Sequence, residues 1–144
     1  MDMLKEYERK IKPFWDIKGC AFKSYNWYRE IVDELVYEVG LKIELERLGY
    51  KVHRQDEFEV YYQEEPTGIF RRMDIVVETE TLGNIVLELK AINYIEDKQR
   101  KQLWSYLRLL NNRYGMLINF GQQSVYTEIW EYDPKNNSCS RVTL

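Results

Sequence analysis

Apolar residues recur at helical spacing in the first third of the chain and again after residue 95. In the first third, this spacing predicts a short helix over 4–12 that ends at Pro13, then a helix-compatible segment over 15–28. A longer helix is predicted over 29–48, where Gly49 can supply the C-cap. Together these segments form a helical N-terminal portion, with residues 1–14 as a helical extension.

Short apolar and alternating runs predict a sheet downstream of these helices. The expected elements are strands over 50–55, 57–63, 69–78 and 84–91, a helix over 95–113, a buried strand over 114–120 and an edge strand over 125–132. A tight connection is expected at Asp56 and a turn over 64–68, and the last residues are expected to pair back weakly. The order α-β-β-β-α-β-β predicts one α/β domain over 1–144, with a central mixed sheet flanked by helices.

Charged residues interrupt the two most apolar of the predicted strands. Asp74 lies within Met73–Val77, and Glu88 and Lys90 lie within Ile85–Ala91. Strands that are apolar on both faces are usually central, and an unpaired carboxylate there is costly, so these charges need partners. Because side chains alternate along a strand, Glu88 and Lys90 point to one face. Two carboxylates converging with an ammonium group suit a hard divalent cation.

Glu34 is a further acidic residue in an apolar setting. On a helical wheel, the helix over 29–48 carries two apolar stripes. The first contains Val32, Val36, Val39 and Ile43, and the second contains Tyr37, Leu41, Leu45 and Leu48. Glu34 falls within roughly 20° of the second stripe, so it faces the core or a cleft. The alternative is an edge carboxylate that reaches water or pairs with Lys42 or Arg47.

Composition narrows the classes of function. The net charge is −3 and the pI is near 5.4, which disfavours extensive sequence-independent binding of nucleic acid but is compatible with a local basic patch. No apolar run approaches the roughly 20 residues that cross a bilayer, and the N-terminus lacks the apolar core of a signal peptide. Cys20 and Cys139 fit neither a disulfide framework nor a zinc or iron–sulfur site. We therefore expect a cytoplasmic protein without a membrane partner.

The order of these residues resembles the GxxExxY family within the PD-(D/E)XK nuclease-like superfamily. The matching positions are Glu34-Leu35-Val36-Tyr37, Gly49, Gln55, Asp74, Glu88-Leu89-Lys90-Ala91, Gln102 with Tyr106, and the segment from Gly115 to Gly121. The resemblance runs from about Ile17 to Gly121. Two positions depart from the family pattern, since Arg29-Glu30-Ile31 replaces its Gly-Pro-Gly and Met73 replaces the Pro before Asp74.

The resemblance implies a restriction-endonuclease-like core and a metal-dependent nuclease. Asp74, Glu88 and the backbone carbonyl of Leu89 would bind Mg²⁺ or Mn²⁺. Glu34 would hold a metal-bound water or a second ion from the helix side. Lys90 would orient the attacking water or offset charge in the transition state.

Downstream residues complete the implied site. Gln102 would position Lys90 or the substrate. Lys98, Arg100 and Lys101 give the second long helix a basic side that could guide phosphate, although a solvated helix face is the commoner explanation. The expected partner is nucleic acid, with DNA favoured over RNA, and a second copy of the chain or a partner subunit is left open.

Two alternatives compete with this interpretation. The first is a buried ion-pair network in which Lys90 neutralises Glu88 while Arg71 or Arg72 neutralises Asp74. The second is a catalytically silent module of the same fold that binds nucleic acid or a protein partner. The net negative charge favours this second alternative.

Overall fold

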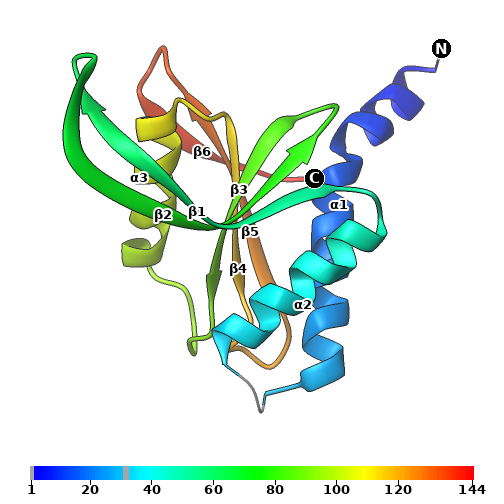
Figure 1. The fold of residues 1–144 in the computed structure, drawn as a ribbon. Coiled ribbons are helices and arrows are strands. Elements are labelled where there is room, and N and C mark those ends of the chain that lie inside the picture. Colours follow the sequence, from blue (N-terminus) through cyan, green and yellow to red (C-terminus); the bar gives the residue numbers. More distant parts are fainter. Residues whose placement is uncertain (1, 31–32) are drawn as a thin grey trace.

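The computed structural model describes residues 2–30 and 33–144, which form a six-stranded sheet with helices on both faces (Figure 1). Its elements are α1 (Met3–Tyr28), α2 (Glu34–Arg47), β1 (Lys51–Tyr62), β2 (Glu65–Thr79), β3 (Gly83–Lys90), α3 (Asp97–Leu110), β4 (Tyr114–Asn119), β5 (Tyr126–Asp133) and β6 (Ser138–Val142). The strands lie in sequence order. All neighbours are antiparallel except β3 and β4, which are parallel and connected through α3. The predicted mixed α/β architecture is confirmed.

The sheet separates two apolar cores. On one face, α1 and α2 pack against alternate residues of the central strands, including Ile75, Ile85, Leu87 and Leu89. On the other face, α3 packs against Val86 and Leu117 through Leu103 and Leu107. The strands that carry Asp74 and Glu88 are therefore internal and covered on both sides, as their apolar sequences predicted.

The sheet forks between β2 and β3. These strands pair from Thr79 and Gly83 up to Ile75 and Leu87, and there the ladder ends. Beyond this point β3 continues beside β4 as far as Lys90. In contrast, β2 continues beside β1 into a two-stranded arm that extends away from the rest of the sheet (Figure 1). Asp74 and Glu88 are the first residues past the fork on the two strands.

The predicted break at Pro13 is wrong, because α1 runs through this residue without interruption. An internal proline removes one backbone hydrogen bond and crowds the carbonyl four residues earlier. Here that residue is Arg9, which is exposed, so water can satisfy its carbonyl. Pro13 itself is buried beside Phe14 and Ile17, and this apolar contact favours the continuous helix. Residues 3–14 are therefore the first turns of α1.

The predicted connection at Asp56 and the turn over 64–68 are also misplaced. Residues 51–62 form one strand, although φ of Gln55 is 52°. The register with β2 shifts later, between Val60 and Tyr61. The hairpin turn lies at Gln63 and Glu64, which both have positive φ angles. Pro66 belongs to β2, in the exposed part of the arm.

Helix boundaries differ from the prediction as well. Arg29 is the C-cap of α1, with a φ angle of 63°. Asp33 is the N-cap of α2, which starts at Glu34. The predicted helix over 29–48 therefore begins too early. Ile31 and Val32 lie outside the described residues. The later helix is shorter than 95–113, and β6 pairs with β5, so β5 is not an edge strand.

Only one of the two stripes predicted on α2 is buried. Tyr37, Leu41 and Leu45 lie in the core, whereas Val39 and Ile43 of the other stripe are exposed. Leu48, at the end of the buried stripe, is exposed as well. Periodicity identifies both stripes but does not say which one packs on the sheet. Within residues 2–30 and 33–144, each helix is too short or too polar to pass through a lipid bilayer.

Candidate active site

The candidate site lies at the fork between β2 and β3. Where the main-chain ladder ends, the Leu89 N–H no longer has a partner on β2, and it donates instead to Asp74 Oδ2 at 2.8 Å. Glu88 shares its strand face with Val86, on the α3 side of the sheet. The fork therefore places a half-buried aspartate and a buried glutamate next to each other.

Glu88 is the more deeply buried of the two acids. Its side chain is 2% exposed, and its Oε1 atom has no hydrogen-bond partner in the described part of the chain. Burial, followed by the charge of Asp74, raises the pKa of Glu88 to about 8. Burial also raises the pKa of Asp74. A buried carboxylate oxygen without a donor, beside a second carboxylate, is chemically suited to a divalent cation.

Residues 2–30 and 33–144 contain no cluster of three or more Asp, Glu, His or Cys side chains that could enclose a cation. Asp74 and Glu88 would thus form an open site with two carboxylates, to which a backbone carbonyl and water could be added. Such a set suits Mg²⁺, which keeps several waters when bound.

Lys90 and Gln102 are connected by a hydrogen bond. Lys90 Nζ donates to Gln102 Oε1 at 3.0 Å, and Gln102 Nε2 donates to the Tyr106 hydroxyl at 3.2 Å. Gln102 and Tyr106 are one turn apart on α3, so they share a helix face. The Tyr106 ring packs edge-on against Phe58 of β1. This chain of contacts holds the Lys90 ammonium group on the same side of the sheet as Glu88.

Glu34 borders the site from the first turn of α2. Its side chain is half-buried, and burial followed by the charge of Asp74 raises its pKa, while Lys90 opposes that rise. The ion pairs among the described residues do not join Lys90 to Glu88 or either Arg71 or Arg72 to Asp74. The structure therefore does not support the alternative in which Lys90 neutralises Glu88 and an arginine neutralises Asp74.

The predicted basic side of α3 is divided. Arg100 is engaged by the buried Glu128 through Nε at 2.9 Å and a terminal nitrogen at 2.7 Å, and by Asp97 at 2.9 Å. It serves to neutralise a buried carboxylate, so the structure does not support it as a free phosphate ligand. Lys98 and Lys101 are exposed, and their role as phosphate contacts stays a prediction.

Sequence reasoning gave no role to Glu38 and Gln55, which lie next to the site. Glu38 is buried on α2 and contacts Arg54 and Gln55 of β1. On the helical wheel Glu38 falls within roughly 20° of Leu45, the same signal that singled out Glu34. The positive φ angle of Gln55 leaves no such mark in the sequence.

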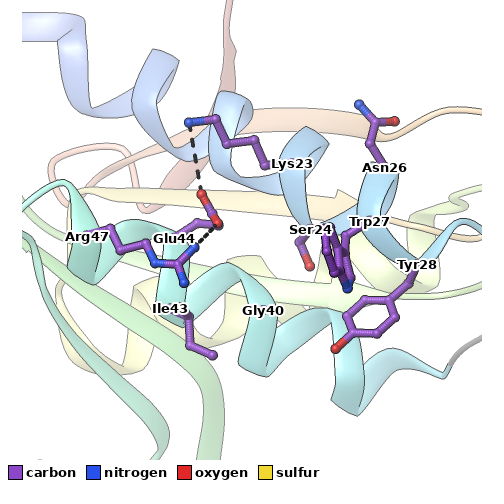
Figure 2. Close-up of a pocket in the computed structure, with 9 residues that line it drawn as sticks. All are labelled: Lys23, Ser24, Asn26, Trp27, Tyr28, Gly40, Ile43, Glu44 and Arg47. Carbon is purple, nitrogen blue, oxygen red and sulfur yellow. Dashed lines mark hydrogen bonds and ion pairs between the residues drawn. The ribbon is translucent and has the colours of Figure 1, made fainter.

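A separate hollow of about 610 Å³ lies between α1 and α2, away from the fork (Figure 2). In it Glu44 pairs with Arg47 at 2.8 Å and with Lys23 at 4.0 Å, and the rings of Trp27 and Tyr28 form one side. The residues that line it include none of the predicted site residues. This hollow is therefore distinct from the candidate site.

Among comparisons with known proteins, a sequence model of a protein family carries the assignment of this chain. No curated protein sequence matches the chain. The crystal structure of SSO0001 aligns with this chain with a TM-score of 0.48 and 20% sequence identity. The alignment covers 83% of this chain and 60% of the SSO0001 chain. A sequence model of the PD-(D/E)XK nuclease superfamily matches residues 14–131, a range that contains every residue at the fork. The chain belongs to the PD-(D/E)XK nuclease superfamily.

Proposed function

We propose that this protein is a metal-dependent nuclease that hydrolyses phosphodiester bonds in nucleic acid, with DNA favoured over RNA. The observation that carries the proposal is the unpartnered, buried Oε1 atom of Glu88 beside Asp74, with Lys90 held on the same face. Membership of the superfamily supports the reaction class. The motif from Glu34 to Tyr37, which opens α2 at the border of the site, supports the narrower assignment to the GxxExxY family.

Asp74, Glu88 and the backbone carbonyl of Leu89 would hold Mg²⁺ or Mn²⁺, with Glu34 available for a bound water or a second ion. The cation, when bound, would polarise the phosphate and make a coordinated water more acidic. Asp74 is already oriented for this role by the Leu89 N–H. Glu88 must lose its proton to contribute a full charge, because its pKa is raised to about 8.

Lys90 would act on the reacting phosphate, and Gln102 would hold Lys90 in place. The ammonium group of Lys90 carries three donors, and the structure commits one of them to Gln102. Gln102 is neutral, so it fixes the direction of the ammonium group without removing its charge. The Lys90 side chain can then stabilise negative charge that develops on the phosphoryl oxygens or hold the attacking water.

The test is cleavage of labelled DNA and RNA by the purified protein with Mg²⁺ or Mn²⁺. Asp74→Ala, Glu88→Ala and Lys90→Ala should each lower the rate by about 100-fold or more, because each removes a group at the reacting phosphate. Their circular dichroism spectra should match that of the unmodified protein. Glu80→Ala is a matched control, since Glu80 is an exposed acid outside the site, and its activity should be unchanged.

Cleavage that persists in Glu88→Ala would rule out this assignment. The rival candidate is a silent module that binds nucleic acid or a protein partner. It is favoured by the net charge of −3 and by the commitment of Arg100 to Glu128. Absence of cleavage under all metal conditions, together with no metal binding at the fork, would support that module instead.

A further inference from the structure

Glu38 is a buried carboxylate that connects α2 to β1. Its side chain accepts from Arg54 Nε at 2.8 Å and forms an ion pair with a terminal nitrogen of Arg54 at 2.7 Å. It also accepts from Gln55 Nε2, at 2.9 Å to one oxygen and 3.1 Å to the other. Glu38 is 2% exposed, so these donors compensate the cost of its burial. Both donors come from adjacent residues of β1.

Gln55 adopts an unusual backbone conformation for a non-glycine residue in a strand. Its φ angle is 52°, and the ladder with β2 runs from Arg54 opposite Ile75 directly to Asp56 opposite Met73. The residue omitted from the ladder on β2 is Asp74. A positive φ angle in a residue other than glycine costs energy, so the surrounding contacts must maintain it. Here Glu38 supplies those contacts.

Gln55 also lies opposite Asp74, because the register between β1 and β2 is the same on both sides of this gap in the ladder. Burial raises the pKa of Asp74, while hydrogen bonds from the Leu89 N–H and from the Gln55 side chain lower it. Asp74 is thus approached from both sides of the fork, by Leu89 on β3 and by Gln55 on β1.

We infer that Gln55 and Glu38 are positioning residues for the cation site: Glu38 fixes the Gln55 amide, and the Gln55 amide fixes the Asp74 carboxylate opposite Glu88. This inference rests on the proposed function, because it assumes that Asp74 binds a cation. Neither residue is itself a ligand. Groups that orient a metal ligand commonly change affinity by about 10- to 100-fold when removed.

Gln55→Gly separates positioning from a purely structural role. Glycine adopts a positive φ angle without strain, and this gain opposes the loss of the two hydrogen bonds to Glu38, so stability should change little while the side chain opposite Asp74 is lost. We expect the metal-free melting temperature to change little and the Kd for Mn²⁺ to increase about tenfold. A structural role alone would move stability and affinity in the same direction.

The chain offers a matched control at Gln63. This glutamine also has a positive φ angle, 47°, but it lies in the turn of the arm. Gln63→Gly relieves the same strain without touching the fork, so its Kd for Mn²⁺ should be unchanged. Mn²⁺ binding is measured from the free-ion signal in electron paramagnetic resonance, and melting is followed in the presence of a chelator.

A double-mutant cycle places Glu38 in the same chain of contacts. Glu38→Gln should weaken Mn²⁺ binding, and the double variant with Gln55→Gly should bind no more weakly than Gln55→Gly alone. Fully additive losses would remove Glu38 from this role. Unchanged affinity in Gln55→Gly, with binding lost in Asp74→Ala, would overturn the inference and leave the nuclease proposal standing. Unchanged affinity in Asp74→Ala would overturn the nuclease proposal itself.

Discussion

At the scale of single residues, the protonation of Glu88 is the property with the widest consequences. Burial favours the neutral acid in the folded chain, and the nearby Asp74 adds to this effect, so the pKa of Glu88 rises to about 8. In the metal-free protein near neutral pH, most molecules therefore carry a proton at this site. Cation binding must release that proton, so affinity for Mn²⁺ should increase with pH.

This raised pKa gives a prediction for metal-free stability. A group whose pKa is higher in the folded than in the unfolded chain contributes stability below its unfolded pKa, and this contribution is lost as pH rises through the folded value. For Glu88 the window runs from the model-compound value of 4.5 to about 8. Glu88→Gln should match the unmodified protein near the lower end and exceed it by on the order of a few kcal/mol above the upper end. Urea unfolding with a chelator measures the difference, and a constant difference across this window would contradict the prediction.

Residue-level reasoning from sequence succeeds where the rule is local. Strand alternation predicts Glu88 and Lys90 on one face, and helical spacing predicts Gln102 beside Tyr106. In the structure Lys90 donates to Gln102, and Gln102 donates to the Tyr106 hydroxyl. Such reasoning fails at Gln55, because a positive φ angle in a glutamine depends on Glu38, a contact distant in sequence. It also fails for Arg100, whose partner Glu128 lies on another strand.

At the scale of elements, the segment that follows β3 and the segment that follows β4 pack against each other beside Lys90. The buried Asn119 at the end of β4 uses its amide to bond both the N–H and the carbonyl of Ile92. The Phe120 N–H donates to the Lys90 carbonyl at 2.8 Å. A Cβ atom at Gly121 would come within 2.2 Å of the Ile92 backbone. The segment after β3 therefore requires a glycine in the segment after β4.

Two glycine substitutions test this requirement against a neutral background. Gly121→Ala should destabilise the protein by about 1–3 kcal/mol, because backbone atoms must shift to admit the methyl group. Gly19→Ala places the same methyl group in open space on the exposed side of α1, and it should stabilise by roughly 0.5–1 kcal/mol through helix propensity. Thermal unfolding compares the two, and equal effects would show that the contact at Ile92 is readily relaxed.

Element boundaries show which physical effects a sequence pattern does not contain. The pattern correctly predicts the central strands, α3 and the pairing of the chain end. It misplaces the break at Pro13, where apolar contacts of the surrounding core outweigh one lost hydrogen bond. It divides β1 at Asp56, whereas the strand continues through the positive φ angle of Gln55 with its register to β2 unchanged there.

At the scale of the whole molecule, the site joins parts of the fold that otherwise make separate cores. Asp74 and Glu88 come from the two branches of the fork, Gln102 comes from α3 on one face, and Glu34 comes from α2. A ligand at the fork would thus link the arm, the main sheet and both helical layers. Binding energy at this point should appear as stability of the whole chain.

A metal titration tests this expectation. With Mn²⁺ at about 100 times its Kd, the folded state should gain roughly 2.7 kcal/mol, which is measured as a rise in melting temperature. The rise should vanish in Asp74→Ala and persist in Glu80→Ala, which keeps the fork intact. A similar rise in Asp74→Ala would mean that Mn²⁺ binds elsewhere on the protein.

The strand order of the sheet also bears on how the chain reaches this structure. Because every strand lies next to its sequence neighbour, most pairings close short loops, and only the parallel pair of β3 and β4 must wait for an intervening helix. Short loop closures favour rapid folding. We therefore expect the hairpin that bears both carboxylates to assemble early, with its acidic pair still hydrated, and to lose that water only when α3 docks.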